Sequence, residues 1–216
     1  MTDAAITGLR RTARRRRYGS PGHIDFQTLL GPRWADLPPA VRARFGPEAC
    51  ARPHAYVGEM RVRANLVGFL MAQLCRLIGT PLAPWRGEAV PVTVDVHTDR
   101  DGALVWDRLY RFEGHPPIFV SSRKIVTERG LVEVVKGGLG MALNLTVEEG
   151  ALHFRSTGYF LELAGVRLPI PGWLTPGRAH VIHRDEGGGR FRFTLSFAHP
   201  LFGETLFQEG VFADPE

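Results

Sequence analysis

The chain has few cysteines and no long hydrophobic run, and both features exclude classes of protein. Of its 216 residues, only Cys50 and Cys75 are cysteines, which is too few for a disulfide framework. No closely spaced set of cysteines and histidines indicates a structural zinc site. No stretch approaches the roughly 18 consecutive apolar residues of a membrane-spanning helix. With 44% hydrophobic and 23% charged residues, the composition is typical of a folded globular chain.

The net positive charge of the chain comes from one run of arginines near its N-terminus. Removing the six charges of this run from the net charge of +5 leaves −1 for the rest, so the remaining chain is close to neutral. Two interpretations of the run stay open. It contacts nucleic acid or an anionic membrane surface, or it is a solvated extension. The run consists of Arg10, Arg11, Arg14, Arg15, Arg16 and Arg17.

The arginine run is not followed by the apolar segment of an export signal, because Tyr18-Gly19-Ser20-Pro21-Gly22 comes next. We therefore expect a cytoplasmic chain in which both cysteines are free thiols. The change in composition predicts a disordered basic tail over residues 1–22 and a single α+β domain over 23–216. Within that domain, a helical part over 23–82 precedes an antiparallel sheet over 88–213.

The helical part contains three amphipathic segments. Two short helices are predicted over residues 24–30 and 37–45, each ended by a Gly-Pro pair. The clearest pattern lies between Val62 and Ile78, where hydrophobic residues recur every three or four positions until Gly79 and Pro81 stop the helix. We expect this segment to be a core helix that the sheet wraps around, or that caps the sheet.

From Val90 onward the hydrophobic pattern changes to a period of two, with turn residues between the segments. This indicates about eight or nine strands joined by short turns, which pair antiparallel. Helices and strands do not alternate, which disfavours a doubly wound parallel sheet. The predicted fold class is α+β, with a strongly curved antiparallel sheet or partly closed barrel and N-terminal helices packing on or into it.

Arg108 is the most informative candidate residue, because it shares a strand face with Trp106, Tyr110 and Phe112. An arginine on an apolar face needs a carboxylate or an anionic ligand, since burial of an unpaired charge is costly. Glu133 is the predicted partner from a nearby strand. Two interpretations are open: a cation holding the carboxylate or phosphate head of a ligand, or a structural Arg–Glu pair that joins two strands.

The proline-rich segment 168–177 is predicted to be a loop that carries Trp173. Trp173 either covers the mouth of a cavity as a lid residue or packs into the core as part of a fixed crossover. His180 and His183 do not indicate a metal site, because residues three apart on a strand point to opposite faces. Gly137-Gly138-Leu139-Gly140 lacks the context of a phosphate-binding loop. No catalytic residue, metal or cofactor is predicted.

Several short motifs in one order resemble a bacterial family, the domain of unknown function 4166. The resemblance covers nearly the whole chain beyond the arginine run. Members of that family occur alone and fused behind saccharopine-dehydrogenase-like modules, which implies a dehydrogenase-type partner and no assigned reaction. The matching residues are Phe26-Gln27-Thr28-Leu29-Leu30-Gly31, Leu37-Pro38-Pro39, Arg42, Trp106-Asp107-Arg108, Phe112, Phe119, Ser121-Ser122, Leu131-Val132-Glu133, the run from Leu168-Pro169 to Leu174-Thr175-Pro176, Pro200-Leu201-Phe202-Gly203 and Gly210.

Three functions follow as hypotheses. The favoured one is a binding module whose cavity holds a small hydrophobic or amphipathic molecule with an acidic head, with Trp106, Arg108, Tyr110, Phe112, Glu133 and Trp173 as candidate ligand-binding residues. The second is an enzyme acting on a small or lipid-like metabolite, with Arg108 and Glu133 in its site. The third is an adaptor that binds nucleic acid or an anionic membrane through the arginine run.

Overall fold

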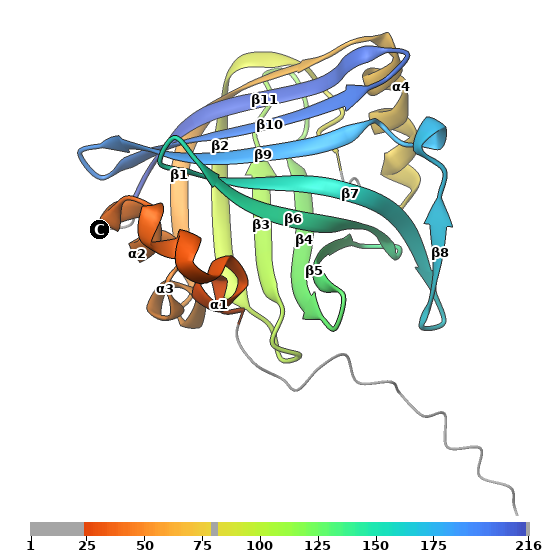
Figure 1. Cartoon of the computed structure of the whole chain (residues 1–216). Helices are drawn as coiled ribbons and strands as arrows, with labels where there is room; N and C mark the ends of the chain where they lie inside the picture. The colour runs from red at the N-terminus through yellow and green to blue at the C-terminus, as the bar shows by residue number, and fades with distance from the viewer. Residues whose placement is uncertain (1–23, 79–81, 215–216) are drawn as a thin grey trace, which may run out of the picture.

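The chain folds into a closed antiparallel β-barrel (Figure 1), as seen in a computed structural model that describes residues 24–78 and 82–214. Within these residues an 11-stranded sheet forms, and all of its strands except β8 (Val166–Ile170) take part in the closed ring. The ring contains β1 (His54–Ala64), β2 (Gly87–Thr98), β3 (Leu104–Tyr110), β4 (Ile118–Thr127), β5 (Gly130–Val135), β6 (Leu139–Glu148), β7 (Ala151–Leu163), β9 (Arg178–Gly187), β10 (Arg190–His199) and β11 (Gly203–Ala213).

The barrel closes because β7 is long enough to pair on both sides. Its full length pairs with β6, from Leu139↔Leu161 to Glu148↔Ala151. Its first residues pair with β9 and its last residues with β8. The prediction of a curved antiparallel sheet is confirmed, whereas the prediction of eight or nine strands and partial closure is wrong. β8 overlaps the first residues of the segment 168–177 that was expected to be a loop, and Pro169 is tolerated there because β8 is an edge strand outside the ring.

Short helices cover one end of the barrel: α1 (Phe26–Leu30), α2 (Pro39–Phe45) and α3 (Pro47–Ala51), with a 3-10 turn, η1 (Gly31–Asp36), between the first two. Asp25 caps α1 by accepting hydrogen bonds from the backbone of Gln27 and Thr28. Phe26 and Phe45 are buried, with ring centroids 5.1 Å apart. The two short helices predicted near the N-terminus are therefore confirmed, and they contribute aromatic side chains to the core.

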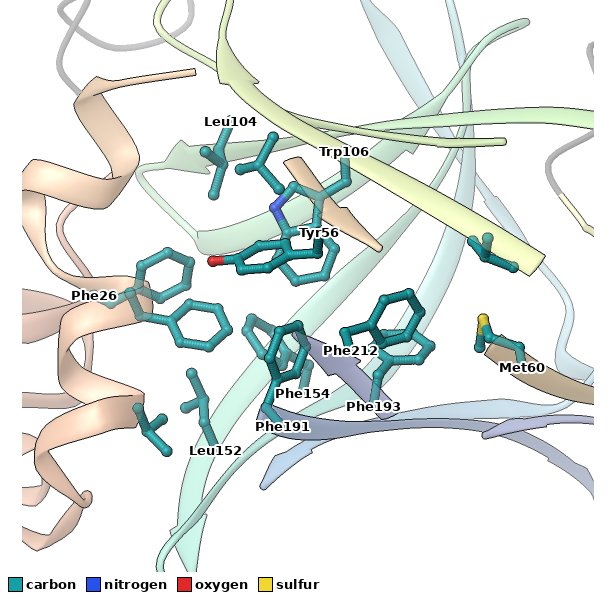
Figure 2. Packing of buried hydrophobic residues seen from close by; sticks show 14 of the residues in the cluster. Phe26, Tyr56, Met60, Leu104, Trp106, Leu152, Phe154, Phe191, Phe193 and Phe212 are labelled. Atoms are coloured by element: carbon teal, nitrogen blue, oxygen red, sulfur yellow. The ribbon is translucent and has the colours of Figure 1, made fainter. Parts of the chain in front are cut away.

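Aromatic side chains fill much of the barrel interior (Figure 2). Phe154 of β7 lies 6.0 Å from the Phe26 ring and 5.9 Å from the Phe45 ring, so helix and sheet share one core. Phe191 and Phe193 of β10 are buried in the same cluster. Other labelled members in Figure 2 are Tyr56, Met60, Leu104, Trp106, Leu152 and Phe212.

The helix expected to occupy the core lies instead at the other end of the barrel, as α4 (Leu66–Cys75) followed by η2 (Arg76–Ile78). Val62 belongs to β1, and the Asn65 side chain begins the helix by accepting a hydrogen bond from Gly68 N. The buried face carries Gly68 and Ala72, not the leucines. The sheet does not wrap around this helix, so of the two predicted arrangements the structure shows the one in which the helix lies at an end of the sheet. Burial of its apolar face in the core was wrongly expected, because periodicity shows that a helix has an apolar face but not what covers it.

Gly68 determines how closely α4 approaches the barrel. A Cβ atom added at this position would lie 1.8 Å from the carbonyl oxygen of Thr205 in β11. Gly68→Val should therefore lower the free energy of unfolding by about 1–3 kcal/mol, as overpacking does. Urea denaturation followed by circular dichroism measures this change.

Gly158→Ala is the control for that substitution, because nothing lies within 4 Å of the added Cβ. It should leave the free energy of unfolding unchanged or raise it by up to about 1 kcal/mol. Equal effects of the two substitutions would show that the contact between α4 and β11 is not close.

The proline-rich segment runs outside the ring. After β8 the chain forms η3 (Gly172–Leu174) and enters β9 at Arg178. Trp173 on η3 is 69% exposed, so it is not packed into the core as a crossover residue. The arginine run, Arg10 to Arg17, lies outside the described residues. No helix in the described part of the chain is long and apolar enough to cross a membrane.

Candidate ligand site inside the barrel

Three neighbouring strands direct charged side chains into the barrel. Trp106 and Arg108 on β3 face the interior together because they are two residues apart. The register places Trp106 opposite Ser122 of β4, and Lys124 of β4 opposite Glu133 of β5. Ser122, Lys124 and Glu133 are all buried. The alternation of the strands thus gathers two cations and one carboxylate on the inner face.

Glu133 is the centre of this charged cluster. Its Oε1 atom lies 3.3 Å from Lys124 Nζ and 4.0 Å from Arg108 Nη2. Arg108 Nη2 also donates a long hydrogen bond of 3.4 Å to Ser122 Oγ. Lys124, and not Arg108, is therefore the closer partner of Glu133. With both cations protonated and Glu133 ionised, the cluster carries one net positive charge.

Burial sets the pKa values of the cluster. Desolvation lowers the pKa of Lys124 to about 8, although the charge of Glu133 opposes the shift. For Glu133, burial acts to raise the pKa, but the nearby charges of Lys124 and Arg108 outweigh it and the pKa is lowered. Lys124 Nζ also lies 3.6 Å from the centroid of the Trp106 ring, where the π-face stabilises a cation.

A small cavity of about 40 Å³ adjoins the cluster. Its lining is mostly aromatic and aliphatic, and the polar side chains that reach it include Arg44, Arg108 and His183. α2 and α3 contribute Phe45 and Cys50, so these helices close the cavity on the side of the N-terminal helices. The volume exceeds what one water molecule requires and accommodates a group of a few heavy atoms.

His183 and Trp106 line this cavity, and their ring nitrogens are buried without a hydrogen-bond partner among the described residues. Neither ring nitrogen of His183 makes a hydrogen bond with the described residues, and neither does Trp106 Nε1. Burial, followed by the charges of Lys124, Arg108 and Arg44, lowers the pKa of His183 well below its usual value, so its ring is neutral. A neutral imidazole carries one N–H donor, and Trp106 supplies a second. The lining of the cavity therefore includes two residues with unpaired donors, together with the positively charged Arg108.

Arg44 holds the helices over the cavity. It donates a hydrogen bond of 2.6 Å from Nε to Asp214 and one of 2.8 Å from Nη2 to Asp185. Its guanidinium also lies 4.8 Å from the centroid of the Phe191 ring. Because Asp185 lies near the end of β9 and Asp214 directly follows β11, these contacts fasten α2 to the barrel rim.

The structure brings together only part of the predicted set. Trp106, Arg108 and Glu133 lie in or beside the charged cluster. Tyr110 is buried further along β3, where its hydroxyl donates a hydrogen bond of 2.9 Å to Gln208, and the Phe112 ring stacks on it at 5.9 Å. Neither lines the cavity, nor does the exposed Trp173.

Sequence reasoning missed Lys124 and His183. Lys124 follows Val120 and Ser122 at a spacing of two, so the period of the strand placed it on an inward face. His183 was correctly predicted to point away from His180, whose Nε2 instead lies 2.9 Å from His153 Nδ1. The aromatic surroundings of His183 come from Phe45, Trp106 and neighbouring strands, which no local pattern connects.

Comparison with known proteins gives a family but no reaction. The uncharacterized protein YndH of Bacillus subtilis (strain 168) is 26% identical over 140 residues, which cover 61% of this chain and 68% of that protein. No solved structure matches the chain. The family model described as "Domain of unknown function (DUF4166)" matches residues 37–212, which include α2, α3 and every strand of the ring. The chain therefore belongs to the DUF4166 family, as its motifs suggested.

Proposed function

We propose that the barrel binds a small amphipathic molecule whose acidic head group lies against Arg108, His183 and Trp106. The observation that carries this proposal is that two residues lining the cavity carry unpartnered donors, beside a cluster with one net positive charge. Buried polar groups without partners are costly, and an anionic acceptor would satisfy them. The apolar part of the ligand would pack against the aromatic lining.

The cavity size defines how such a ligand fits. A volume of about 40 Å³ holds the head group alone. A longer apolar part requires the helices over the cavity to move, and the contacts of Arg44 with Asp185 and Asp214 are what resist this movement. We infer that entry proceeds past α2 and α3, which meet at Gly46 and Pro47.

Binding of octanoate, with octanol as the uncharged probe of the same chain length, tests the proposal. Isothermal titration calorimetry should show that octanoate binds and that octanol binds at least tenfold more weakly. Arg108→Met should weaken octanoate binding by about ten- to a hundredfold, because hydrogen bonds to charged groups contribute about 1.5–3 kcal/mol. Thermal denaturation checks that the variant is folded.

Arg111→Met is the matched control, since Arg111 is exposed just beyond β3 and does not line the cavity. It should bind octanoate like the unmodified protein. Equal binding of octanoate and octanol, or an Arg108→Met variant with unchanged affinity, would leave the Lys124–Glu133–Arg108 cluster as a purely structural feature.

The other predicted functions have less support. Free thiols at Cys50 and Cys75 agree with the proposed cytoplasmic setting. An enzymatic activity and a dehydrogenase-type partner stay predictions from sequence and resemblance. Binding of nucleic acid or membrane through the arginine run also stays a prediction, because the run lies outside the described residues.

A further inference from the structure

Three segments meet at the barrel end opposite the N-terminal helices (Figure 1). They are α4, the turn between β10 and β11, and η3 with the residues that lead into β9. The Asn65 side chain at the start of α4 donates a hydrogen bond of 2.9 Å to the carbonyl oxygen of Phe202 in the turn. Thr205 beside that turn donates to the carbonyl oxygen of Pro176, which follows η3. These contacts hold the segments together as one surface.

This surface, here called the apolar end, exposes large hydrophobic side chains from all three segments. α4 and η2 present leucines at positions 66, 70, 74 and 77, which lie on one helical face because of their spacing. Each exposed residue has between 48% and 86% of its side-chain area accessible. Contiguous apolar patches of this kind mark interaction sites. The residues are Leu66, Leu70, Leu74, Leu77, Trp173, Leu174, Leu201 and Phe202.

Arginines outnumber acidic residues around the apolar end. Residues 61–87 contain four arginines and no aspartate or glutamate, and residues 163–184 also lack acidic residues. Arg63, Arg76, Arg86 and Arg178 are exposed and form no ion pair with the described residues. Glu204 at the start of β11 is the acidic residue closest in sequence to the exposed turn. The rim is therefore positive.

We propose that the apolar end is a membrane-binding surface, which inserts the leucines of α4 and Trp173 into the interfacial region of an anionic bilayer. A ten-residue helix is too short to span a membrane, but its apolar face can lie in the plane of the interface. Tryptophan favours this depth, and arginines at the rim reach the lipid phosphates while their stems stay in the apolar layer. This inference stands independently of the cavity.

The arginines at the rim favour a bilayer over a second copy of the chain as the binding partner of the apolar end. Two copies joined through this end would bring the arginines of both rims together, and like charges at an interface are costly. Phosphates of an anionic lipid surface instead compensate them. The apolar contacts and the charge interactions then both favour binding to the bilayer.

Vesicle co-sedimentation of the full chain tests the proposal, with phosphatidylcholine vesicles that contain or lack phosphatidylglycerol. The unmodified protein should bind the vesicles with phosphatidylglycerol and lose part of this binding at high salt. Leu70→Glu combined with Leu74→Glu should reduce the bound fraction at least tenfold. Both leucines are exposed, so circular dichroism should show an intact fold.

The matched control is Leu163→Glu combined with Val166→Glu, which adds the same two charges at the β7–β8 hairpin. These residues are 52% and 59% exposed and lie at the opposite end of β8 from η3. This variant should bind vesicles like the unmodified protein. An equal loss in both double variants would overturn the proposal, because added negative charge alone would then explain it.

A second variant separates this surface from the arginine run, by replacing all six arginines between positions 10 and 17 with glutamine. Loss of binding in this variant, together with full binding of the α4 double variant, would overturn the proposal in favour of the run. Sedimentation velocity tests the remaining occupant. An oligomer that the α4 substitutions dissociate, with no vesicle binding by the unmodified protein, would identify the apolar end as a subunit interface.

Discussion

Replacing Glu133 with glutamine is expected to lower the free energy of unfolding by about 3–5 kcal/mol, the range for breaking a buried ion pair. The substitution keeps the shape of the side chain but removes the charge that lies 3.3 Å from Lys124 and 4.0 Å from Arg108. The buried Lys124 and the partly buried Arg108 then face each other without compensation. Urea denaturation at neutral pH measures the loss.

A double-mutant cycle shows whether the loss comes from the ion pair itself. Lys124→Met alone should also destabilise, because it leaves Glu133 buried with only the more distant Arg108. The double variant Lys124→Met with Glu133→Gln should lose less than the sum of the two, with a coupling of about 0.5–3 kcal/mol. Strictly additive losses, or single losses below about 1 kcal/mol, would contradict a coupled buried pair.

Lys124 should titrate near pH 8, far below the ordinary value of 10.5, because its ammonium group is desolvated inside the barrel. The sequence contains one other lysine, Lys136, which is exposed, so only two lysine signals need to be assigned. Nuclear magnetic resonance of the two labelled side chains follows the titration directly. In the Glu133→Gln variant the pKa of Lys124 should fall further, because the charge that opposes desolvation is gone.

This titration has a consequence for stability whose sign follows from proton linkage. Between about pH 8 and 10.5 the folded protein has lost the Lys124 proton, whereas the unfolded chain still holds it. The unfolded state therefore binds more protons, and stability rises with pH in this window. The free energy of unfolding of the unmodified protein, relative to that of Lys124→Met, should increase from pH 8 to 10.5. If the difference in free energy of unfolding between the two proteins does not change with pH, Lys124 is solvated.

Much of the architecture was readable from local patterns, because a strand or a short helix displays its own period. The alternation around Trp106 and Arg108 predicted an inward face on β3, and the structure places both side chains inside the barrel. The short helices that become α1 and α2 were predicted from their apolar spacing and Gly-Pro ends. Family membership also followed from motifs that stand in the sequence.

The prediction for α4 failed for a reason that applies to any short amphipathic helix. The leucines between positions 66 and 77 show one apolar face, and burial of that face is the usual outcome. Contact with Thr205, far away in the chain, requires a glycine, so the face with Gly68 turns to the barrel and the leucines remain exposed. Close packing of the α4 backbone against the β11 backbone produces no periodic pattern in the sequence.

The sequence by itself determined the antiparallel strands, the inward position of Arg108 and the membership of the family, since each depends on residues that are close neighbours in the chain. Only the tertiary structure decided that β6 and β7 close the ring, that Lys124 is nearer than Arg108 to Glu133, and that His183 joins Trp106 at one cavity. These relations are distances across a barrel. Strand parity gives the face on which a side chain lies, but only closure and register give its partner.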